Sequence, residues 1–516
     1  MPEHPIDRPG GGADQQFERL MGAGGPLAAG ELAPSRLSRR GRGWSGPPDP
    51  GSRRVGRIAA LVALASTVLV LAMGIVSRGA AGVPQTPGPI VEVAPADGDV
   101  VTVVSKVLVK LRHALGEGSM PADPMESLDD MATTPTARLR MAAVAGELVG
   151  PDEAIERIAA LEEELAGEGV LAADAAALRK VYEDGAESLD AVTRDELVQH
   201  HGWFGRLALS YGAADSDPAR AEFVKGGEAL VAVLVVLMGG AGLALLAGLV
   251  LFIVGVTMFA GGALRTKFVP PAPGGSVYLE LFAVFITGFV VLKLGIGLVA
   301  SMVGDGHDIM LFWVTLALQL GLAMVVLWPR LRGVSRMRAR ADLGWHRGTG
   351  LMREVGAGIV GYLAALPLFV GGVLLTLLLA TVRGLMTGKG EPGSSAVPAP
   401  HNPVMEAIMQ GDAMMVVAVL LLGTVWAPIV EETVFRGAMY RHLRARLGFF
   451  GSALITALIF AAIHPYGFLF IPPLAGLAIA FAALREWRGS LIASMTAHFC
   501  HNATLMTVMV VMVVMA

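Results

Sequence analysis

The chain has 516 residues, of which 54% are hydrophobic and 16% charged, and its mean hydropathy is +0.60. These values exceed what a water-soluble globular protein tolerates, and they indicate a protein that crosses a membrane several times. The net charge of -4 gives no reason to expect nucleic-acid binding, and the single cysteine, Cys500, excludes both an intramolecular disulfide framework and a CxxC metal or redox motif.

The first 56 residues are rich in Gly, Pro and Arg and have almost no apolar periodicity. Such a segment cannot bury enough surface to fold, so residues 1–56 are interpreted as a disordered basic tail. An apolar run over residues 57–77 follows directly. A cleaved signal peptide has a much shorter leader, so this run is predicted to be a retained signal-anchor helix that crosses the membrane.

A polar region, residues 78–228, comes next. It opens with a linker rich in Pro and Gly, and then places Ile, Leu and Ala three and four residues apart with acidic residues between them. This spacing predicts amphipathic helices of an inserted soluble domain. We find no cluster of His, Cys or a nucleophile with a base in its sequence, and we assign the domain no chemistry.

Apolar segments then recur to the end of the chain. The first is uncharged and too short for two full spans plus a turn, so it is predicted to be one long helix. Together with the anchor they give about nine spans, and the fold class is an all-α polytopic transmembrane bundle. Residues 229–354 are expected to be transmembrane helices of unknown role, and Lys293 within them is left unassigned. The segments after the anchor are 229–264, 277–303, 308–328, 355–382, 413–443, 450–466, 468–484 and 490–515.

The loops between these segments predict an orientation. Basic loops follow the long first segment and recur at residues 329–350, 441–448 and 485–489, and all of them fall on the side of the basic tail when the spans are counted. Lys and Arg favour the cytoplasmic side, so the amino terminus is predicted to be cytoplasmic, in a cell inner membrane.

Polar residues recur four positions apart in three of the late segments. Glu432 and Arg436 have the favourable i, i+4 orientation for a helical ion pair, whereas Glu431 is rotated about 100° from Glu432 and has no obvious partner on its own helix. Charges at membrane depth cost several kcal/mol unless they are paired or solvated, so these residues are functional candidates.

The same spacing relates Phe460 to His464 and His498 to Asn502, so that each pair can point into one cavity. From the rise per residue, Glu431, His464, His498 and Asn502 lie about 12–21 Å from the basic ends of their helices, near the middle of the membrane. A carboxylate can activate water, one imidazole can share its proton, and a second imidazole with an amide can stabilise an oxyanion.

Here the sequence resembles a known family. "EETVFR" matches the motif EExxxR, "FAAIH" matches FxxxH and "HFCHN" matches HxxxN, in the order found in the CPBP intramembrane proteases, the family of CAAX proteases and bacteriocin-processing proteins. Each motif alone is weak, but all three in order on apolar segments are a strong signal. The resemblance covers residues 355–516 at most, which we expect to form the protease domain.

The resemblance implies that Glu431 activates the hydrolytic water with help from His464, and that His498 and Asn502 bind the oxyanion or a metal. Glu432, Arg436 and Phe460 would support the site. The family has been described both as metal-dependent and as dependent on glutamate alone; if a metal is used, His464 and His498 are its predicted ligands and zinc is the candidate ion. The implied substrate is a membrane-embedded or lipidated peptide.

Other interpretations stay open. Pro465 disfavours helical geometry in the residue before it, so His464 can also be read as a structural histidine at a helix break. His501 competes with His498, but only His498 shares a helix face with Asn502. Cys500 lies roughly 200° round the helix from His498, so these two cannot form a nucleophile and base. The alternative function is a catalytically inactive membrane scaffold or a proton-coupled transport protein, in which the amide of Asn502 would be expendable.

Overall fold

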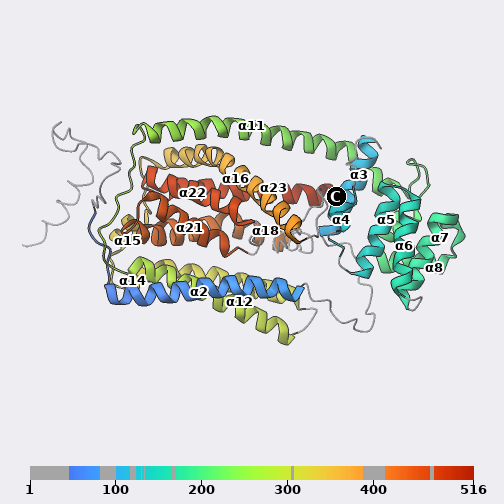
Figure 1. The fold of residues 1–516 in the computed structure, drawn as a ribbon, viewed down its shortest axis with the longest axis horizontal. Coiled ribbons are helices and arrows are strands. Elements are labelled where there is room, and N and C mark those ends of the chain that lie inside the picture. Colours follow the sequence, from blue (N-terminus) through green and yellow to red (C-terminus); the bar gives the residue numbers. More distant parts are fainter. Residues whose placement is uncertain are drawn as a thin grey trace, which may run out of the picture. The chain divides into compact units, whose positions relative to one another are not determined.

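A computed structural model describes the chain over residues 46–81, 100–116, 124–129, 131–132, 134–165, 169–303, 307–387, 413–464 and 470–516. These ranges are helical, contain no strand, and hold one isolated bridge between Gly46 and Pro271 (Figure 1). The all-α prediction is therefore confirmed for this part of the chain. Residues 1–45 of the predicted tail and the linker 82–99 lie outside the described residues.

Seven helical stretches of the described chain are long and apolar enough to cross a membrane, which confirms the polytopic prediction. The first long apolar segment is a single helix, as predicted. Two further helices, α21 (Phe449–Ala462) and α22 (Ile471–Arg488), occupy the remaining two predicted segments, and α21 is too short to cross a full bilayer alone. The seven stretches are Arg53–Met73, Ala221–Ala260, Val277–Val303, Ile309–Leu331, Leu351–Met386, Ala413–Arg444 and Ile492–Met515.

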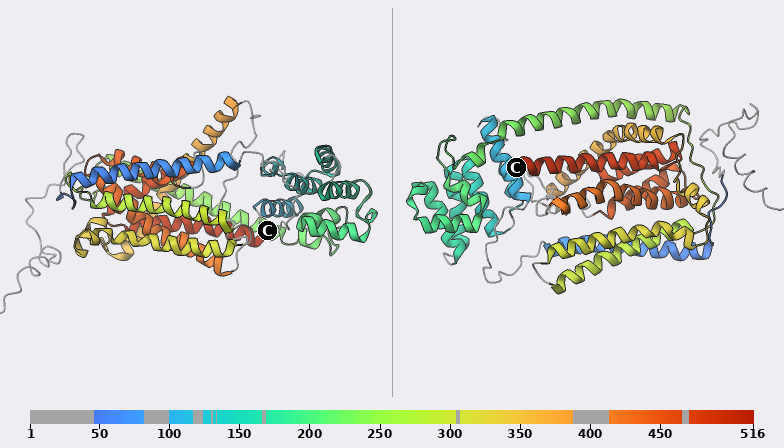
Figure 2. Two further views of the ribbon diagram at one scale, coloured as in Figure 1. Left: turned by 90° about the horizontal axis from the view of Figure 1, so that it is seen from below. Right: turned by 180° about the vertical axis from the view of Figure 1, so that it is seen from behind.

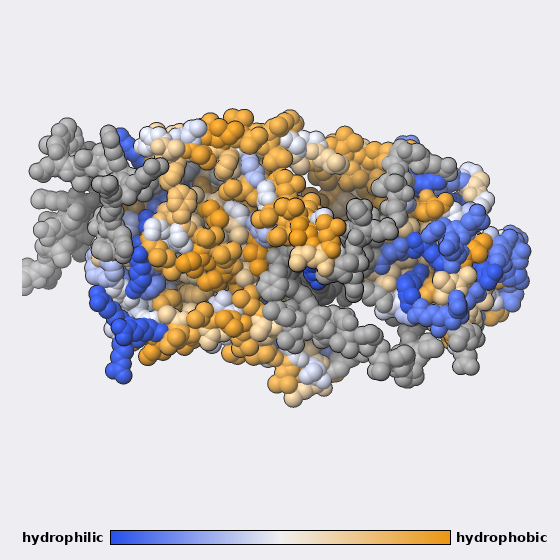
Figure 3. Space-filling view, in the orientation of Figure 1, coloured by the Kyte–Doolittle hydropathy of each residue, from blue (hydrophilic) through white to orange (hydrophobic). Residues whose placement is uncertain are grey.

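The helices of these stretches pack closely in sequence-distant pairs. Helix α2 lies along α12, and α16 lies between α11 and the pair formed by α22 and α23, an arrangement that Figure 2 shows from two further sides. The exposed side chains of this region are largely apolar, as the orange surface in Figure 3 shows, and that surface suits contact with lipid. The helices are α2 (Arg53–Ala81), α11 (Gly227–Ala260), α12 (Val277–Val303), α13 (Asp308–Leu322), η3 (Ala323–Leu327), α14 (Trp328–Leu331), α15 (Arg336–Leu343), α16 (Leu351–Thr387) and α23 (Ile492–Met515).

The polar insert is helical, as its spacing predicted. Its apolar residues form a core of their own, which includes Leu139, Ile158, Leu178 and Phe204. The outer faces of its helices are hydrophilic in Figure 3. Its elements are α3 (Val100–Leu115), α4 (Glu126–Asp129), α5 (Pro135–Leu148), α6 (Pro151–Leu165), α7 (Val170–Asp184), η2 (Ala186–Ser188), α8 (Ala191–His201), α9 (Trp203–Leu209) and α10 (Ala221–Val224).

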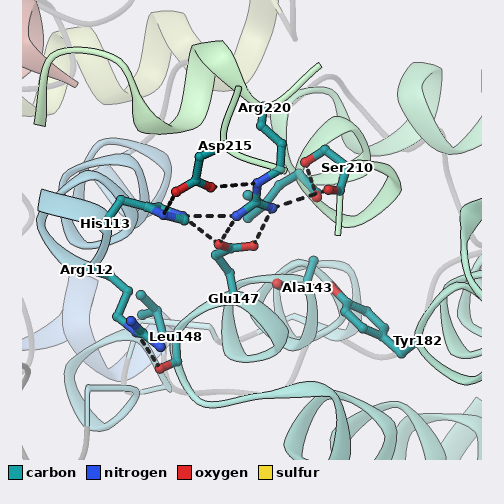
Figure 4. Close-up of polar contacts among 10 residues, drawn as sticks. Arg112, His113, Ala143, Glu147, Leu148, Tyr182, Ser210, Asp215 and Arg220 are labelled. Atoms are coloured by element: carbon teal, nitrogen blue, oxygen red, sulfur yellow. Dashed lines mark hydrogen bonds and ion pairs between the residues drawn. The ribbon is translucent and has the colours of Figure 1, made fainter. Parts of the chain in front are cut away.

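A buried polar cluster ties this insert together around Glu147 of α5 (Figure 4). Its carboxylate accepts hydrogen bonds from Arg220 at 2.5 and 3.0 Å and lies 2.7 Å from Nε2 of His113 on α3. Asp215 lies 3.7 Å from the same imidazole and 3.6 Å from Arg220. A second histidine cluster places Asp174 within 3.1 Å of His200 and His201. The sequence interpretation missed both clusters because their members are far apart along the chain.

The insert is expected to lose stability at low pH because Glu147 becomes protonated. Burial alone would raise the pKa of this carboxyl, but the hydrogen bonds from His113 and Arg220 outweigh it and lower the pKa from 4.5 to about 2. A lowered pKa stabilises the fold above pH 4.5, and about 3 kcal/mol is lost as the pH falls towards 2. Hydrogen exchange of the α5 amides in the full protein should accelerate across this window, whereas Glu147→Gln should remove that pH dependence. Equal acid sensitivity in both proteins would contradict the assignment.

One end of the helix bundle is held by buried ion pairs, on the side where the basic loops lie. Arg441 donates to Asp49 at 2.9 Å and lies 2.9 Å from Asp342, and Tyr440 and Arg444 both bond to Glu486. These contacts join segments far apart in the sequence. They hold in place the end of the helix that carries EExxxR, and so its position along the bundle axis. Asp49 lies in the predicted tail, so the last part of that tail packs onto the bundle.

Candidate active site

The helix that carries EExxxR is one continuous element with two π-helical segments. It runs through α18 (Ala413–Leu421), the π segment η4 (Leu422–Trp426), α19 (Ala427–Glu432), the π segment η5 (Thr433–Met439) and α20 (Tyr440–Arg444). Segments of π-helix are uncommon and often occur at functional sites. The two glutamates lie at the end of α19, between the two π segments.

Glu432 is the most highly connected acid of the site. Its Oε1 accepts hydrogen bonds from Nη1 of Arg436 at 2.8 Å and from Nδ1 of His498 at 3.1 Å, and Glu432 and Arg436 are both fully buried. The predicted ion pair is therefore present. Because an ionised carboxylate only accepts, Nδ1 of His498 carries the hydrogen in this contact. Arg436 also donates to the carbonyl oxygen of Ala478 on α22 at 3.2 Å, which joins the two helices.

Two phenylalanines enclose the arginine and the histidine. The guanidinium carbon of Arg436 lies 4.5 Å from the ring of Phe460 and 5.3 Å from that of Phe481. Phe481 also stacks on His498, with ring centres 5.4 Å apart. The sequence predicted a role for Phe460 but not for Phe481, because an aromatic residue on an apolar helix carries no mark of its partners. Cation–π contacts help to stabilise a buried charge away from water.

Glu431 faces the other nitrogen of the same imidazole. Its Oε2 lies 3.8 Å from Nε2 of His498, and this oxygen is buried without a hydrogen-bond partner among the described residues. The distance is too long for a direct hydrogen bond and is one that a water molecule can bridge. His498 thus lies between two carboxylates, of which Glu432 is neutralised by Arg436 and Glu431 is not.

His464 lies just beyond the end of α21, as the following Pro465 predicted for this residue. Its Nδ1 is 2.7 Å from the carbonyl oxygen of Phe460, and its ring packs on Phe460 with centres 4.8 Å apart. Since a carbonyl only accepts, Nδ1 donates, and Nε2 of the neutral ring carries the lone pair. Phe460 contacts Arg436, His464 and His498, so it joins the three motifs.

Asn502 bonds to the helix that carries EExxxR rather than to its glutamates. Its Nδ2 donates to the carbonyl oxygen of Gly423 in η4 at 2.8 Å. No hydrogen bond joins it to Glu431, Glu432 or His498 within the part of the chain that the structure describes. A second hydrogen on Nδ2 is available for another acceptor.

His501 lies on a different face of α23. It is 6% exposed, and its ring packs against Tyr362 and Phe369 of α16, with ring centres 6.1 and 5.3 Å apart. We expect His501→Phe, which keeps this aromatic packing, to leave enzymatic activity unchanged, and His498→Phe to abolish it. Peptide cleavage by the two purified variants checks this, and equal loss in both would contradict the choice of His498.

The side chains that could hold a metal do not form a ready site. No group of three or more His, Cys, Asp and Glu side chains in the described ranges is arranged to bind a metal ion. His464 and His498, the predicted ligands, both border Phe460, and Nδ1 of each is bonded, to a backbone carbonyl and to Glu432, which is the contact that the second nitrogen of a metal-ligating histidine usually makes.

The fold and the cluster define a polytopic helical membrane protein whose acidic, basic and imidazole side chains meet between apolar helices. Residues 413–504 match the family model described as Type II CAAX prenyl endopeptidase Rce1-like. This range includes all three motifs, so the resemblance is confirmed for the C-terminal region, and the chain carries a domain of an intramembrane protease family. No curated protein and no solved structure is significantly similar to the chain.

Proposed function

We propose that this protein is an intramembrane endopeptidase that hydrolyses a peptide bond with water activated by Glu431. One observation carries the proposal most directly: His498 lies between Glu432, which holds its Nδ1, and Glu431, whose buried Oε2 has no hydrogen-bond partner in the described chain. A carboxylate held in this way has a free lone pair with which to accept a proton from water.

In the proposed reaction Glu431 takes one proton from a water molecule while the water oxygen bonds to the carbonyl carbon of the scissile peptide. The carbonyl oxygen becomes an oxyanion. When the carbon–nitrogen bond breaks, the proton passes to the leaving amine, and the products are a new carboxylate and a new amino terminus. Nε2 of His498, 3.8 Å from Glu431, is close enough to hold the water or to receive its proton.

The supporting residues act through His498. Glu432 fixes the imidazole with Nδ1 protonated, as a carboxylate does in catalytic triads, and Arg436 supplies the counter-charge of Glu432. Phe460 and Phe481 pack on the guanidinium of Arg436, and such cation–π contacts help to stabilise its buried charge. Glu432 and Arg436 are therefore positioning residues rather than reacting groups.

His464 and Asn502 are proposed to serve the oxyanion and the proton. Asn502 has one amide hydrogen beyond its bond to Gly423 and would donate to the oxyanion, whereas His464, whose Nδ1 donates to the Phe460 carbonyl, would accept the proton through Nε2. Donors already held in place stabilise a developing oxyanion without reorganising. We also propose that the substrate is a membrane-embedded or lipidated peptide, since the site lies between apolar helices.

The division of the chain and its orientation are parts of the same proposal. Residues 355–516 would form the protease domain, 78–228 a soluble domain and 229–354 additional transmembrane helices, with 57–77 as the anchor. The ion-paired end of the bundle, where the basic loops gather, would face the cytoplasm of a cell with this protein in its inner membrane.

Purified protein in detergent, incubated with a membrane proteome or a lipidated peptide library, tests the proposal. Mass spectrometry should find new termini with wild type that disappear with Glu431→Ala while the variant remains folded. Asn502→Ala separates the alternatives, because hydrolysis needs the amide donor and a proton relay does not. An absence of Glu431-dependent termini, with and without added zinc, would overturn the proposal in favour of an inactive scaffold or a transport protein.

A further inference from the structure

Two hydroxyl groups of α21 are buried and have no role in the candidate active site. Ser452 and Thr456 are each 0% exposed, and neither Oγ of Ser452 nor Oγ1 of Thr456 has a hydrogen-bond partner among the described residues. Helical threonines elsewhere in the protein satisfy their hydroxyls on the preceding turn: Thr424 donates to Leu420 O and Thr67 to Ala63 O, at 2.6 and 2.8 Å. Thr456 does not, so its hydroxyl is directed elsewhere.

The two hydroxyls face the protein interior on the same side as the catalytic motif. Phe450, Leu454 and Leu458 are exposed on the lipid side of α21, whereas positions 452, 456 and 460 are buried. Residues four apart share a helix face, so Ser452 and Thr456 continue the row that Phe460 begins. This row packs against α22, α20 and η5, and the ring of Phe460 holds the guanidinium of Arg436.

The opposite helix offers small side chains at this level. Ala475, Ala478 and Ala482 of α22 are buried in the same clusters as α21. None of them has a side-chain atom that can accept or donate a hydrogen bond. The side chains of these alanines therefore offer the hydroxyls of α21 no hydrogen-bond partner.

Further unpartnered polar atoms belong to the EExxxR motif, whose Arg436 lies on the ring of Phe460. Nε of Arg436, Oε2 of Glu432 and Oε2 of Glu431 are all buried and lack a hydrogen-bond partner within the described ranges. A buried polar atom without a partner costs about 1–3 kcal/mol. Each such atom in a native protein calls for an explanation, and ordered water is the usual partner.

We propose that Ser452 and Thr456 bind ordered water molecules that connect, past Nε of Arg436 and Oε2 of Glu432, to the oxygen of Glu431. The binding of water depends only on the geometry above; its use as the supply of hydrolytic water rests on the proposed function. Ser452 lies one turn inside α21 from the basic loop 441–448, so the water path starts near the polar end of the bundle and runs towards the middle of the membrane.

The first test is structural and needs no activity. A high-resolution density map of the wild-type protein in nanodiscs should show ordered solvent within hydrogen-bond distance of Oγ1 of Thr456. A map at the same resolution of Thr456→Val should lose that solvent. Well-resolved side chains with no solvent at Thr456 in the wild type would overturn the proposal, whatever the enzyme does.

The second test concerns the supply role and uses matched variants. Thr456→Val should lower kcat by about 2- to 10-fold, the effect of one lost hydrogen bond in the path, with KM and thermal midpoint unchanged. Thr456→Ser should restore kcat, and Thr67→Val, which removes a buried hydroxyl satisfied by its own helix, should leave kcat unchanged. Ser452→Ala should repeat the loss.

The outcomes separate this inference from the proposed function. Solvent at Thr456 with unchanged kcat in Thr456→Val would overturn the supply role, and a lowered thermal midpoint in both the Val and Ser variants would assign Thr456 to packing instead. If the wild type cleaves nothing in a Glu431-dependent way, the proposed function has failed, and the solvent density alone decides whether the water site exists.

Discussion

Replacing Glu431 by Gln is expected to lower kcat for peptide cleavage by about 10²- to 10⁴-fold, the usual contribution of a general base. The amide keeps the size of the side chain but cannot take a proton from water. Because Oε2 of Glu431 makes no hydrogen bond within the described chain, the substitution should leave the thermal midpoint nearly unchanged. Quenched time courses of purified wild type and variant, with thermal unfolding in the same detergent, measure both quantities.

The neighbouring glutamate provides the matched control. Glu432→Gln makes the same chemical change one residue away, but Glu432 is fully buried between Arg436 and His498. This variant should lose stability as well as activity, because a buried arginine loses its counter-charge. Equal stability loss in the two variants, or full activity in Glu431→Gln, would show that the roles of the two carboxylates are assigned wrongly.

Replacing Arg436 by Met is expected to lower the free energy of unfolding by about 3–5 kcal/mol, which is the effect of breaking a buried ion pair from one side. The side chain is fully buried, is bonded to Glu432 at 2.8 Å and lies on the rings of Phe460 and Phe481. Methionine fills much of the volume, so the loss reports the uncompensated carboxylate more than a cavity. Denaturant-induced unfolding in mixed micelles measures it.

A double variant separates charge from shape. In Arg436→Met combined with Glu432→Gln, neither member of the ion pair is left as an unpaired charge, so part of the lost stability should return while activity stays low. The exposed Arg353→Met should change the free energy of unfolding by less than about 0.5 kcal/mol. A double variant no more stable than Arg436→Met alone would contradict the ion-pair explanation.

Local spacing predicted several contacts of the site correctly. The interval between Glu432 and Arg436 gave an ion pair, and Pro465 marked the break after which His464 lies. The rotation between Glu431 and Glu432 left Glu431 without a partner on its own helix, as the structure has it. These features depend on neighbours within one turn, where helix geometry alone decides which side chains meet.

The contacts between helices could not be predicted from the sequence. The pattern could not show that His498 bonds to Glu432 and approaches Glu431, that Asn502 bonds to Gly423, or that Phe481 stacks on His498. These depend on the heights and rotations of three helices. The π segments on either side of α19 also change which side chains share a helix face. No residue type in the sequence predicts where such a segment occurs.

One measurement tests the central claim most directly. Cleavage of an identified substrate in H₂¹⁸O by wild type should place one ¹⁸O atom in the new carboxylate, detected as a mass shift of the fragment that carries it, and Glu431→Gln of unchanged fold should form this fragment about 10²- to 10⁴-fold more slowly. Labelled product at the wild-type rate from Glu431→Gln, or new termini without the label, would contradict hydrolysis by water that Glu431 activates.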